Sequence, residues 1–327
     1  MPLNLSPATT QAPIAEIGAD APFSTAPRGP STLAATSVRW NERILAWIFI
    51  ACAFVSVLTT FSIIYVLVTE SWPFFQSVSL ATFLGGTKWA PLIDQTYGVL
   101  PLVCGTILVT AGAAVFALPL GLLSAIYLSE YASPKARGVL KPVLEILAGI
   151  PSIVYGYFAL VVITPLLQKA FPGIEVFNAL SASIAVAIMT LPLVSSLCED
   201  ALHVVPRALR EGAYALGATK MEVSTQVVVP AALSGIGAAF LLAISRAIGE
   251  TMIVALAAGA TPTMTLSPLR SIQTMTGYIA QTAMGDVEHG TTGYQTIYAV
   301  GILLFAMTVA LNLFSISLVK KYRQKYD

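Results

Sequence analysis

The chain has 327 residues, of which 56% are hydrophobic and only 10% are charged, whereas soluble domains carry about 25% charged residues. So few charges cannot cover a water-exposed surface of this size, which excludes an ordinary soluble enzyme and favours an integral membrane protein. The net charge of +1 provides no basic face of the kind that binds nucleic acid.

Residues 1–38 are rich in Ala, Pro, Ser and Thr and nearly free of charge. They contain no apolar run long enough for the core of a signal peptide. A segment of this composition buries too little apolar surface to fold alone. We interpret it as a flexible cytoplasmic tail, with a regulatory role as the alternative, and we assign residues 39–327 to a membrane domain.

Six long apolar segments follow the tail, and each can supply the roughly 20 helical residues that cross the hydrocarbon core. Their approximate bounds are 44–69, 99–128, 143–167, 179–198, 231–259 and 294–318. Backbone groups in lipid have to be satisfied within their own segment, which selects helices over open strands. The sequence therefore predicts an all-α membrane protein with about six transmembrane helices.

The distribution of Lys and Arg predicts the orientation, because cytoplasmic loops carry an excess of these residues. With the N-terminus inside, the inside segments hold Arg39, Arg43, Lys135, Arg137, Lys141, Arg207, Arg210, Lys220, Lys320, Lys321, Arg323 and Lys325. The outside loops then hold only Lys88, Lys169 and Arg270. We therefore expect both termini on the cytoplasmic side.

Two long loops are expected on the outside, at residues 70–98 and 260–293. The first contains the aromatic residues Trp72, Phe74, Phe75, Trp89 and Tyr97. Aromatic side chains are enriched at membrane–water interfaces, so this loop is interpreted as an anchor at the membrane surface. The second loop is rich in Thr, Gly and Met, and its composition does not assign it a role.

The inside loop at about 199–230 is a long polar segment between two spans. It is expected to form two short helices, at 207–216 and 219–227, with Gly217 as the turn and Pro230 at the start of the next span. A compact helix-turn-helix under the membrane suits docking into a groove on a soluble partner. An amphipathic loop lying on the lipid headgroups is the alternative, and composition leaves both open.

The fifth span contains two charged residues, Arg246 and Glu250. At i and i+4 on a helix they would share a face and could pair. A charge at the bilayer centre costs about 2.5–3.5 kcal/mol on insertion scales, so such residues normally face a bundle interior or a water-filled path. We predict that Arg246 and Glu250 line the substrate path, with Arg246 suited to an oxyanion; a structural ion pair is the alternative.

Small residues recur every four positions on the neighbouring face of the same span. They are Gly235, Ala239, Ala243 and Ala247. Such a ridge lets another helix approach closely. It predicts a central place for this span in the helix bundle.

Motifs of soluble enzymes are missing from the sequence. Gly212 and Gly217 have part of the P-loop spacing, but Ala218 stands where the motif requires Lys. Cys52, Cys104 and Cys198 lie far apart without metal-ligand spacing. We therefore predict no catalytic residue, no metal site and no cofactor, and we expect any ATP hydrolysis to reside in a partner.

The inside loop carries a spaced motif: Glu211-Gly212-Ala213, three residues, Gly217, nine residues, and Val227-Val228-Val229-Pro230. It resembles the "EAA" coupling motif of ABC importer permeases, with Gly212, Val227 and Val229 as conservative departures. The resemblance implies a MetI-like type I ABC permease fold. It also implies that Glu211, Gly212, Ala213, Gly217 and Pro230 belong to a loop that docks on a separate ATPase subunit.

Four further stretches, at 98–106, 128–134, 144–157 and 245–252, resemble the phosphate-importer permeases of the Pst system, and among these the PstC subunit more than the PstA subunit. The resemblance covers about residues 40–325. It implies a heterodimer with a PstA-like permease, a PstB-like ATPase dimer and a PstS-like phosphate-binding protein outside. It also implies a multi-pass protein of the bacterial inner membrane.

The sequence therefore indicates the non-catalytic permease subunit of an ATP-driven importer for inorganic phosphate. Within the same class, the alternative is a permease for another oxyanion such as molybdate or sulfate. From a different class, the alternative is a stand-alone secondary transporter, which should show inverted repeats and more intramembrane ionisable residues.

Overall fold

The computed structural model describes residues 40–288 and 290–322. The interpretation of residues 1–38 as a tail falls outside this part of the chain, as do Arg39, Arg323 and Lys325. The chain divides after Leu58 into two units. Helix α1 (Trp40–Ser77) contributes to both, and the described side chains of its first half are exposed.

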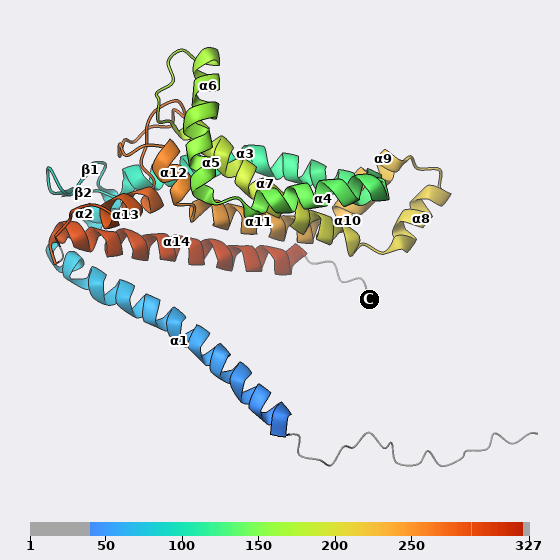
Figure 1. Ribbon diagram of the computed structural model, residues 1–327, viewed down its shortest axis with the longest axis horizontal. Coiled ribbons are helices and arrows are strands. Elements are labelled where there is room, and N and C mark those ends of the chain that lie inside the picture. Colours follow the sequence, from blue (N-terminus) through green and yellow to red (C-terminus); the bar gives the residue numbers. More distant parts are fainter. Residues whose placement is uncertain (1–39, 289, 323–327) are drawn as a thin grey trace, which may run out of the picture. The chain divides into compact units, whose positions relative to one another are not determined.

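The second unit, from Thr59 onward, is almost entirely helical (Figure 1). After α1 the chain forms α2 (Leu80–Gly85), β1 (Trp89–Ala90), β2 (Thr96–Tyr97), α3 (Leu100–Ile126), the π-helical turn η1 (Tyr127–Tyr131), α4 (Pro134–Gly149), α5 (Ser152–Phe158), η2 (Ala159–Ile163), α6 (Thr164–Ala170) and α7 (Ala179–His203). It continues with α8 (Arg207–Ala215), α9 (Lys220–Glu222), η3 (Val223–Val228), α10 (Val229–Ala231), α11 (Leu233–Ile248), α12 (Met252–Ala257), α13 (Met275–Ala283) and α14 (Thr292–Tyr322).

Within the described residues, five helices are long and apolar enough to cross a membrane. They are Glu42–Ser77, Leu100–Tyr131, Ser152–Ala170, Ala179–His203 and Thr292–Ser317. A sixth span is possible if Lys220–Ala231 and Leu233–Ile248, which are bent by 72° relative to each other, cross as one broken segment. The prediction of an all-α chain with about six transmembrane helices is confirmed.

Two of the predicted spans are interrupted. The expected helix at 143–167 breaks at Ile150, whose extended backbone follows from its place before a proline; the spanning helix starts at Ser152. The expected span at 231–259 also breaks, because α11 ends at Ile248 and the chain resumes helical structure only at Met252. With 16 residues, α11 is about 24 Å long, shorter than the roughly 30 Å hydrocarbon core.

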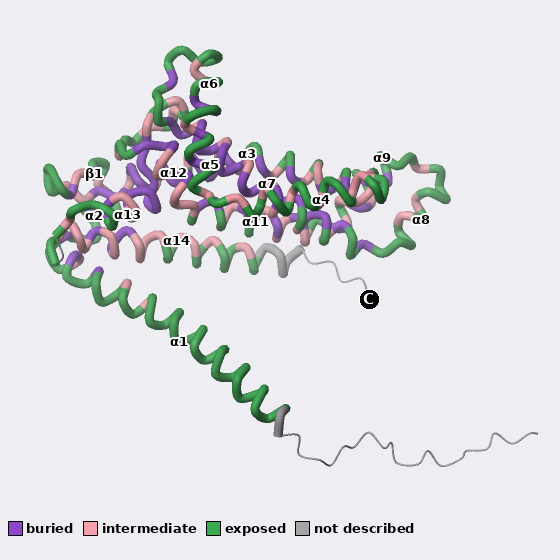
Figure 2. The backbone as a smooth tube through the Cα atoms, in the orientation of Figure 1, coloured by how far each residue is buried: buried purple, intermediate pink, exposed green. Residues whose placement is uncertain are grey.

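The core of the second unit forms where α7 packs against α3 and α11, and buried residues concentrate along these helices (Figure 2). Glycines permit the close approach: a Cβ at Gly121 on α3 would lie 2.5 Å from the Val194 side chain. On α11, Ala239, Ala243 and Ala247 are buried, and a Cβ at Gly235 would lie 2.6 Å from the Ala201 Cβ of α7. The small-residue ridge therefore packs within the chain, as its spacing predicts.

The aromatic residues of segment 70–98 form a second core. Phe74 and Trp89 are buried, and T-shaped ring contacts link Phe74 to Phe83 and Trp89 to Tyr278 of α13. The short antiparallel pair β1–β2 places Trp89 opposite Tyr97. The interpretation as a membrane-surface anchor is therefore wrong for Phe74 and Trp89, whereas Trp72 is 64% exposed.

Candidate functional site

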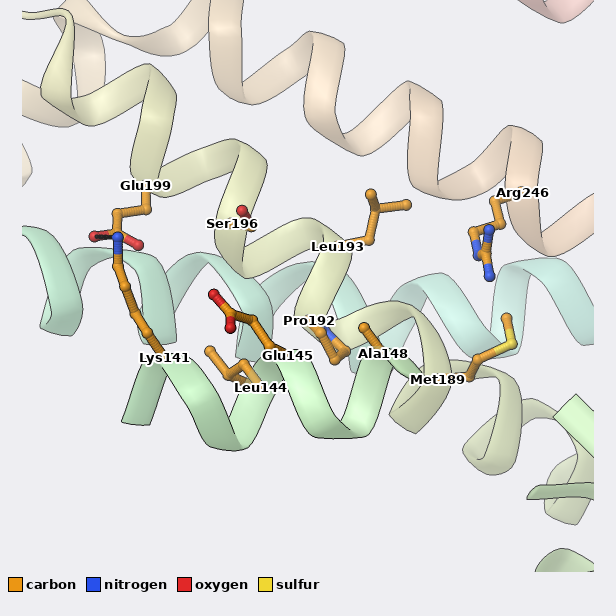
Figure 3. Close-up of a pocket in the computed structure, with 10 residues that line it drawn as sticks. All are labelled: Lys141, Leu144, Glu145, Ala148, Met189, Pro192, Leu193, Ser196, Glu199 and Arg246. Atoms are coloured by element: carbon orange, nitrogen blue, oxygen red, sulfur yellow. Dashed lines mark ion pairs between the residues drawn. The ribbon is translucent and has the colours of Figure 1, made fainter. Parts of the chain in front are cut away.

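A cavity of about 400 Å³ opens between α4, α7 and α11 (Figure 3). Its walls contain four charged side chains among apolar ones. The lining residues are Lys141, Leu144, Glu145, Ala148, Met189, Pro192, Leu193, Ser196, Glu199 and Arg246. The mixture of convergent charges with an apolar wall is typical of a site that binds a small polar ligand.

The local sequence of α4 explains how it lines this cavity. Ser133 caps the helix by accepting a hydrogen bond from the backbone N–H of Ala136. Lys141, Leu144, Glu145 and Ala148 then recur at helical spacing, so they share one face. On α7 the lining residues run from Met189 to Glu199, a length of about 15 Å. Lys141 and Glu199 form one end of the cavity, and Arg246 lies at the other end beside Met189 (Figure 3).

Arg246, on the last turn of α11, extends its side chain toward the cavity. Its side chain has no hydrogen-bond or ion-pair partner among residues 40–288 and 290–322. A guanidinium stays charged at every physiological pH and can donate two parallel hydrogen bonds to two oxygens of an oxyanion. This end of the cavity therefore has a free cationic group.

Glu250 lies outside the helix that carries Arg246, because α11 ends two residues earlier. Its carboxylate Oε1 accepts a 3.3 Å hydrogen bond from the N–H of Ile253, and its carbonyl accepts a 2.6 Å bond from the Thr276 hydroxyl. No ion pair joins Glu250 to Arg246 in the described part of the chain. The expected i,i+4 pairing on one helix is therefore wrong, and Glu250 satisfies backbone groups at the start of α12.

A cluster of charges that sequence reasoning missed lies at the opposite end of the cavity. The Glu199 side chain is only 4% exposed, and its Oε1 lies 3.1 Å from Arg137 Nη2, 3.0 Å from Lys141 Nζ and 3.5 Å from His203 Nε2. The three cations lie within ion-pair distance of Oε1, but none donates a hydrogen bond to it with good geometry. The available signal was the i,i+4 spacing of Arg137 with Lys141 and of Glu199 with His203.

The inside loop forms the expected helix-turn-helix. Helix α8 carries the Glu211-Gly212-Ala213 triplet, and Gly217 adopts φ +85°, a left-handed conformation that favours glycine. Thr219 and Glu222 form a capping box at the start of α9. The Glu222 carboxylate accepts hydrogen bonds from the Thr219 backbone N–H and hydroxyl, both at 2.8 Å.

The outer surface of this loop exposes several apolar side chains among its charged ones. Tyr214 is 44% exposed, Leu216 is 90% exposed and Met221 is 69% exposed, and α8 has no buried residue. Pro230 lies in α10, one residue before the end of that helix, so the loop joins α11 through the 72° bend. Figure 1 places α8 and α9 at one end of the second unit and β1, β2 and α13 at the other.

Comparisons with known proteins agree with this architecture. Residues 117–326 match the family model of the binding-protein-dependent transport system inner membrane component. A bacterial ABC transporter involved in the import of the acidic polysaccharide alginate contains a chain of similar fold, with a TM-score of 0.62 and 14% sequence identity, covering 87% of this chain and 99% of that chain.

Two curated relatives are similar over most of their length. The probable ABC transporter permease protein YqgH of Bacillus subtilis is 35% identical over 261 residues, which are 79% of this chain and 84% of the relative. The phosphate transport system permease protein PstC of Haemophilus influenzae is 33% identical over 286 residues, which are 80% and 88% of the two chains. This chain therefore belongs to the family of binding-protein-dependent transport system inner membrane components, the permease subunits of ABC importers.

Proposed function

We propose that this permease subunit imports inorganic phosphate, with the cavity between α4, α7 and α11 as part of its substrate path. The observation that carries the proposal is the Arg246 guanidinium, which faces the cavity without a described partner. A fixed cation suits a tetrahedral oxyanion. The names of relatives such as PstC from Haemophilus influenzae and Mesorhizobium japonicum support phosphate in particular.

In this proposal a PstA-like subunit completes the path from the other side, and a PstS-like protein delivers phosphate from outside. A PstB-like ATPase dimer binds the loop at 207–229. The exposed apolar side chains Tyr214, Leu216 and Met221 support docking to a partner, because exposed apolar patches mark interaction sites. Closure of the ATPase pair then moves the loop and alternates access to the cavity.

The path is proposed to end on the cytoplasmic side, where α8 and α9 lie, with both termini on that side and the chain in the bacterial inner membrane. Leaving Arg246, phosphate moves along α7 toward Lys141 and Arg137. These two cations lie beside two carboxylates, those of Glu199 and Glu145, so the charges at the inner end of the path are nearly balanced and phosphate can leave it.

The decisive experiment is uptake by the complete transporter in proteoliposomes. We expect labelled phosphate to accumulate in an ATP-dependent manner. An excess of about tenfold of unlabelled sulfate or molybdate should not compete with it. ATP-dependent uptake of sulfate or molybdate without uptake of phosphate would show that the substrate is another oxyanion. Uptake that needs an ion gradient and no ATPase would show that the protein is a secondary transporter.

A further inference from the structure

Helix α8, which carries the coupling triplet, has no buried residue of its own. Even a Cβ added at Gly212 would meet nothing within 4 Å. An isolated helix of 9 residues is too short to be stable in water. Its position therefore depends on a few specific contacts with the rest of the permease.

The strongest of these contacts come from one side chain, Arg210. Its Nη1 donates a 2.6 Å hydrogen bond to the carbonyl of Val205, and its Nη2 donates a 2.8 Å bond to the carbonyl of Leu202. Its Nη2 and Nε also bind the same oxygen of Glu130, at 3.0 and 3.3 Å. The Arg210 and Glu130 side chains are only 16% and 9% exposed.

The three acceptors belong to the ends of the two central helices. Leu202 is in the last turn of α7, Val205 follows that turn, and Glu130 lies in η1, which continues α3. The last carbonyls of a helix have no partner inside it and attract cations. Since α3 and α7 pack along each other, the hydrogen bonds of Arg210 connect α8 to the ends of both helices.

The geometry requires arginine in particular. A planar guanidinium presents five N–H donors in a fixed fork, whereas the ammonium of lysine has three donors and acts as a point charge. Four contacts in three directions therefore fit Arg210 and not a lysine. The stretch 128–134, which contains Glu130, is thereby connected to the coupling loop, although 80 residues separate the two partners.

We infer that Arg210, held by Glu130, is a positioning residue that transmits the movement of the ATPase from α8 to α3 and α7, and so to the cavity. The inference rests on the proposed coupling role of the 207–229 loop. Without the contacts of Arg210, the ATPase still binds the exposed face of α8. The movement of α8 is then not passed to the ends of α3 and α7. ATP hydrolysis is then uncoupled from transport.

The test uses the complete transporter in proteoliposomes and measures phosphate transported per ATP hydrolysed. We expect Arg210→Gln to lower this ratio about tenfold, within the range of known coupling free energies. Arg210→Lys should also lower it, because a point charge cannot make all the contacts. Glu130→Gln, which keeps an oxygen acceptor, should have a smaller effect. Lys135→Gln is the matched control, since Lys135 is an exposed inside cation with no described partner.

The ratio separates coupling from folding, because a loss of assembled complex lowers transport and hydrolysis together. If Arg210→Gln does not assemble, Arg210→Lys and Glu130→Gln carry the test. Ratios equal to wild type in the Arg210 and Glu130 variants would overturn the inference.

A second readout does not depend on the substrate. In a chain whose native cysteines are replaced by alanine, Ser196→Cys places a thiol on α7 in the cavity wall. A non-hydrolysable ATP analogue should change its labelling rate, and adding Arg210→Gln should remove this change. An unchanged response in the double variant would overturn the inference. Absence of phosphate transport by the wild type would instead count against the proposed substrate and leave this readout valid.

Discussion

The free guanidinium of Arg246 leads to a direct prediction for transport. Arg246→Gln should lower phosphate uptake at least tenfold, about the effect of losing a charge-assisted hydrogen bond, while the amount of protein in the membrane stays near normal. The double variant Arg246→Gln with Glu250→Gln should not recover, because these side chains do not pair. Uptake assays with immunoblots of membranes check both expectations, and full uptake by the double variant would remove Arg246 from the site.

Glu199 gives a prediction for stability. Glu199→Gln leaves Arg137 and Lys141 without their carboxylate, and we expect a loss of about 1–3 kcal/mol, limited because both cations are partly solvated. The apparent melting temperature of the detergent-solubilised complex measures it. Glu145→Gln is the matched control on the same cavity wall, since Glu145 is exposed and has no described partner. Equal melting temperatures would show that the Glu199 cluster does not hold α4.

The sequence predicted that Arg246 lines the substrate path, which stays a prediction, and it misjudged the relation of Arg246 to Glu250. A single Gly249 in an apolar run does not reveal a helix end, since glycine in a helix costs only about 1 kcal/mol. The break is stabilised by Thr276, whose hydroxyl binds the Glu250 carbonyl from 26 residues away. Such a tertiary contact has no signal in the local sequence.

The turn between α8 and α9 gives a prediction for the coupling loop. Gly217 adopts φ +85°, where an L side chain costs about 1–2 kcal/mol. Gly217→Leu should distort the turn and abolish phosphate uptake and ATPase stimulation, although the chain still inserts in the membrane. Gly212→Ala is the control: its added Cβ meets open space, and uptake should persist. Normal ATPase stimulation with Gly217→Leu would contradict the coupling role of this turn.

The helical elements differ in how well the sequence predicts them. The expected helices at 207–216 and 219–227 correspond closely to α8 and to α9 with η3, because the glycine turn and the capping residues are local signals. The start of the third span at Ser152 had a local signal in Pro151, which the averaged hydropathy of the segment obscured. The composition of a segment therefore predicted that it is helical, whereas single residues such as Pro151 and Gly217 determine where each helix begins or ends.

For the molecule as a whole, composition predicted the membrane class and the helix number, since both depend on sums over long segments. The charged clusters could not be predicted in this way. Arg137 meets Glu199, and Arg210 meets Glu130, only because η1, α4, α7 and α8 converge at the same end of the second unit. Pairings between residues this distant depend on the packed arrangement of helices.

The orientation in the membrane is the remaining prediction, and single cysteines can test it. Cysteines at residues 138 and 215 should resist a membrane-impermeant thiol reagent in intact cells, whereas cysteines at 90 and 285 should react. Gly138, Ala215 and Gly285 are exposed in the chain. Protection of cysteines at 138 and 215 would therefore mean that these positions lie on the cytoplasmic side or are covered by the bound ATPase.

Ala90 is only partly exposed, and Ile93, at 86% exposure, is the better position on the same loop. Permeabilised cells that lack the ATPase serve as the control, because residues 138 and 215 should then become reactive. This arrangement follows from the excess of Lys and Arg in the inside segments, which are retained in the cytoplasm. Labelling at 138 and 215 in intact cells, with none at 93 and 285, would invert the orientation and place the coupling helix α8 on the side that has no ATP.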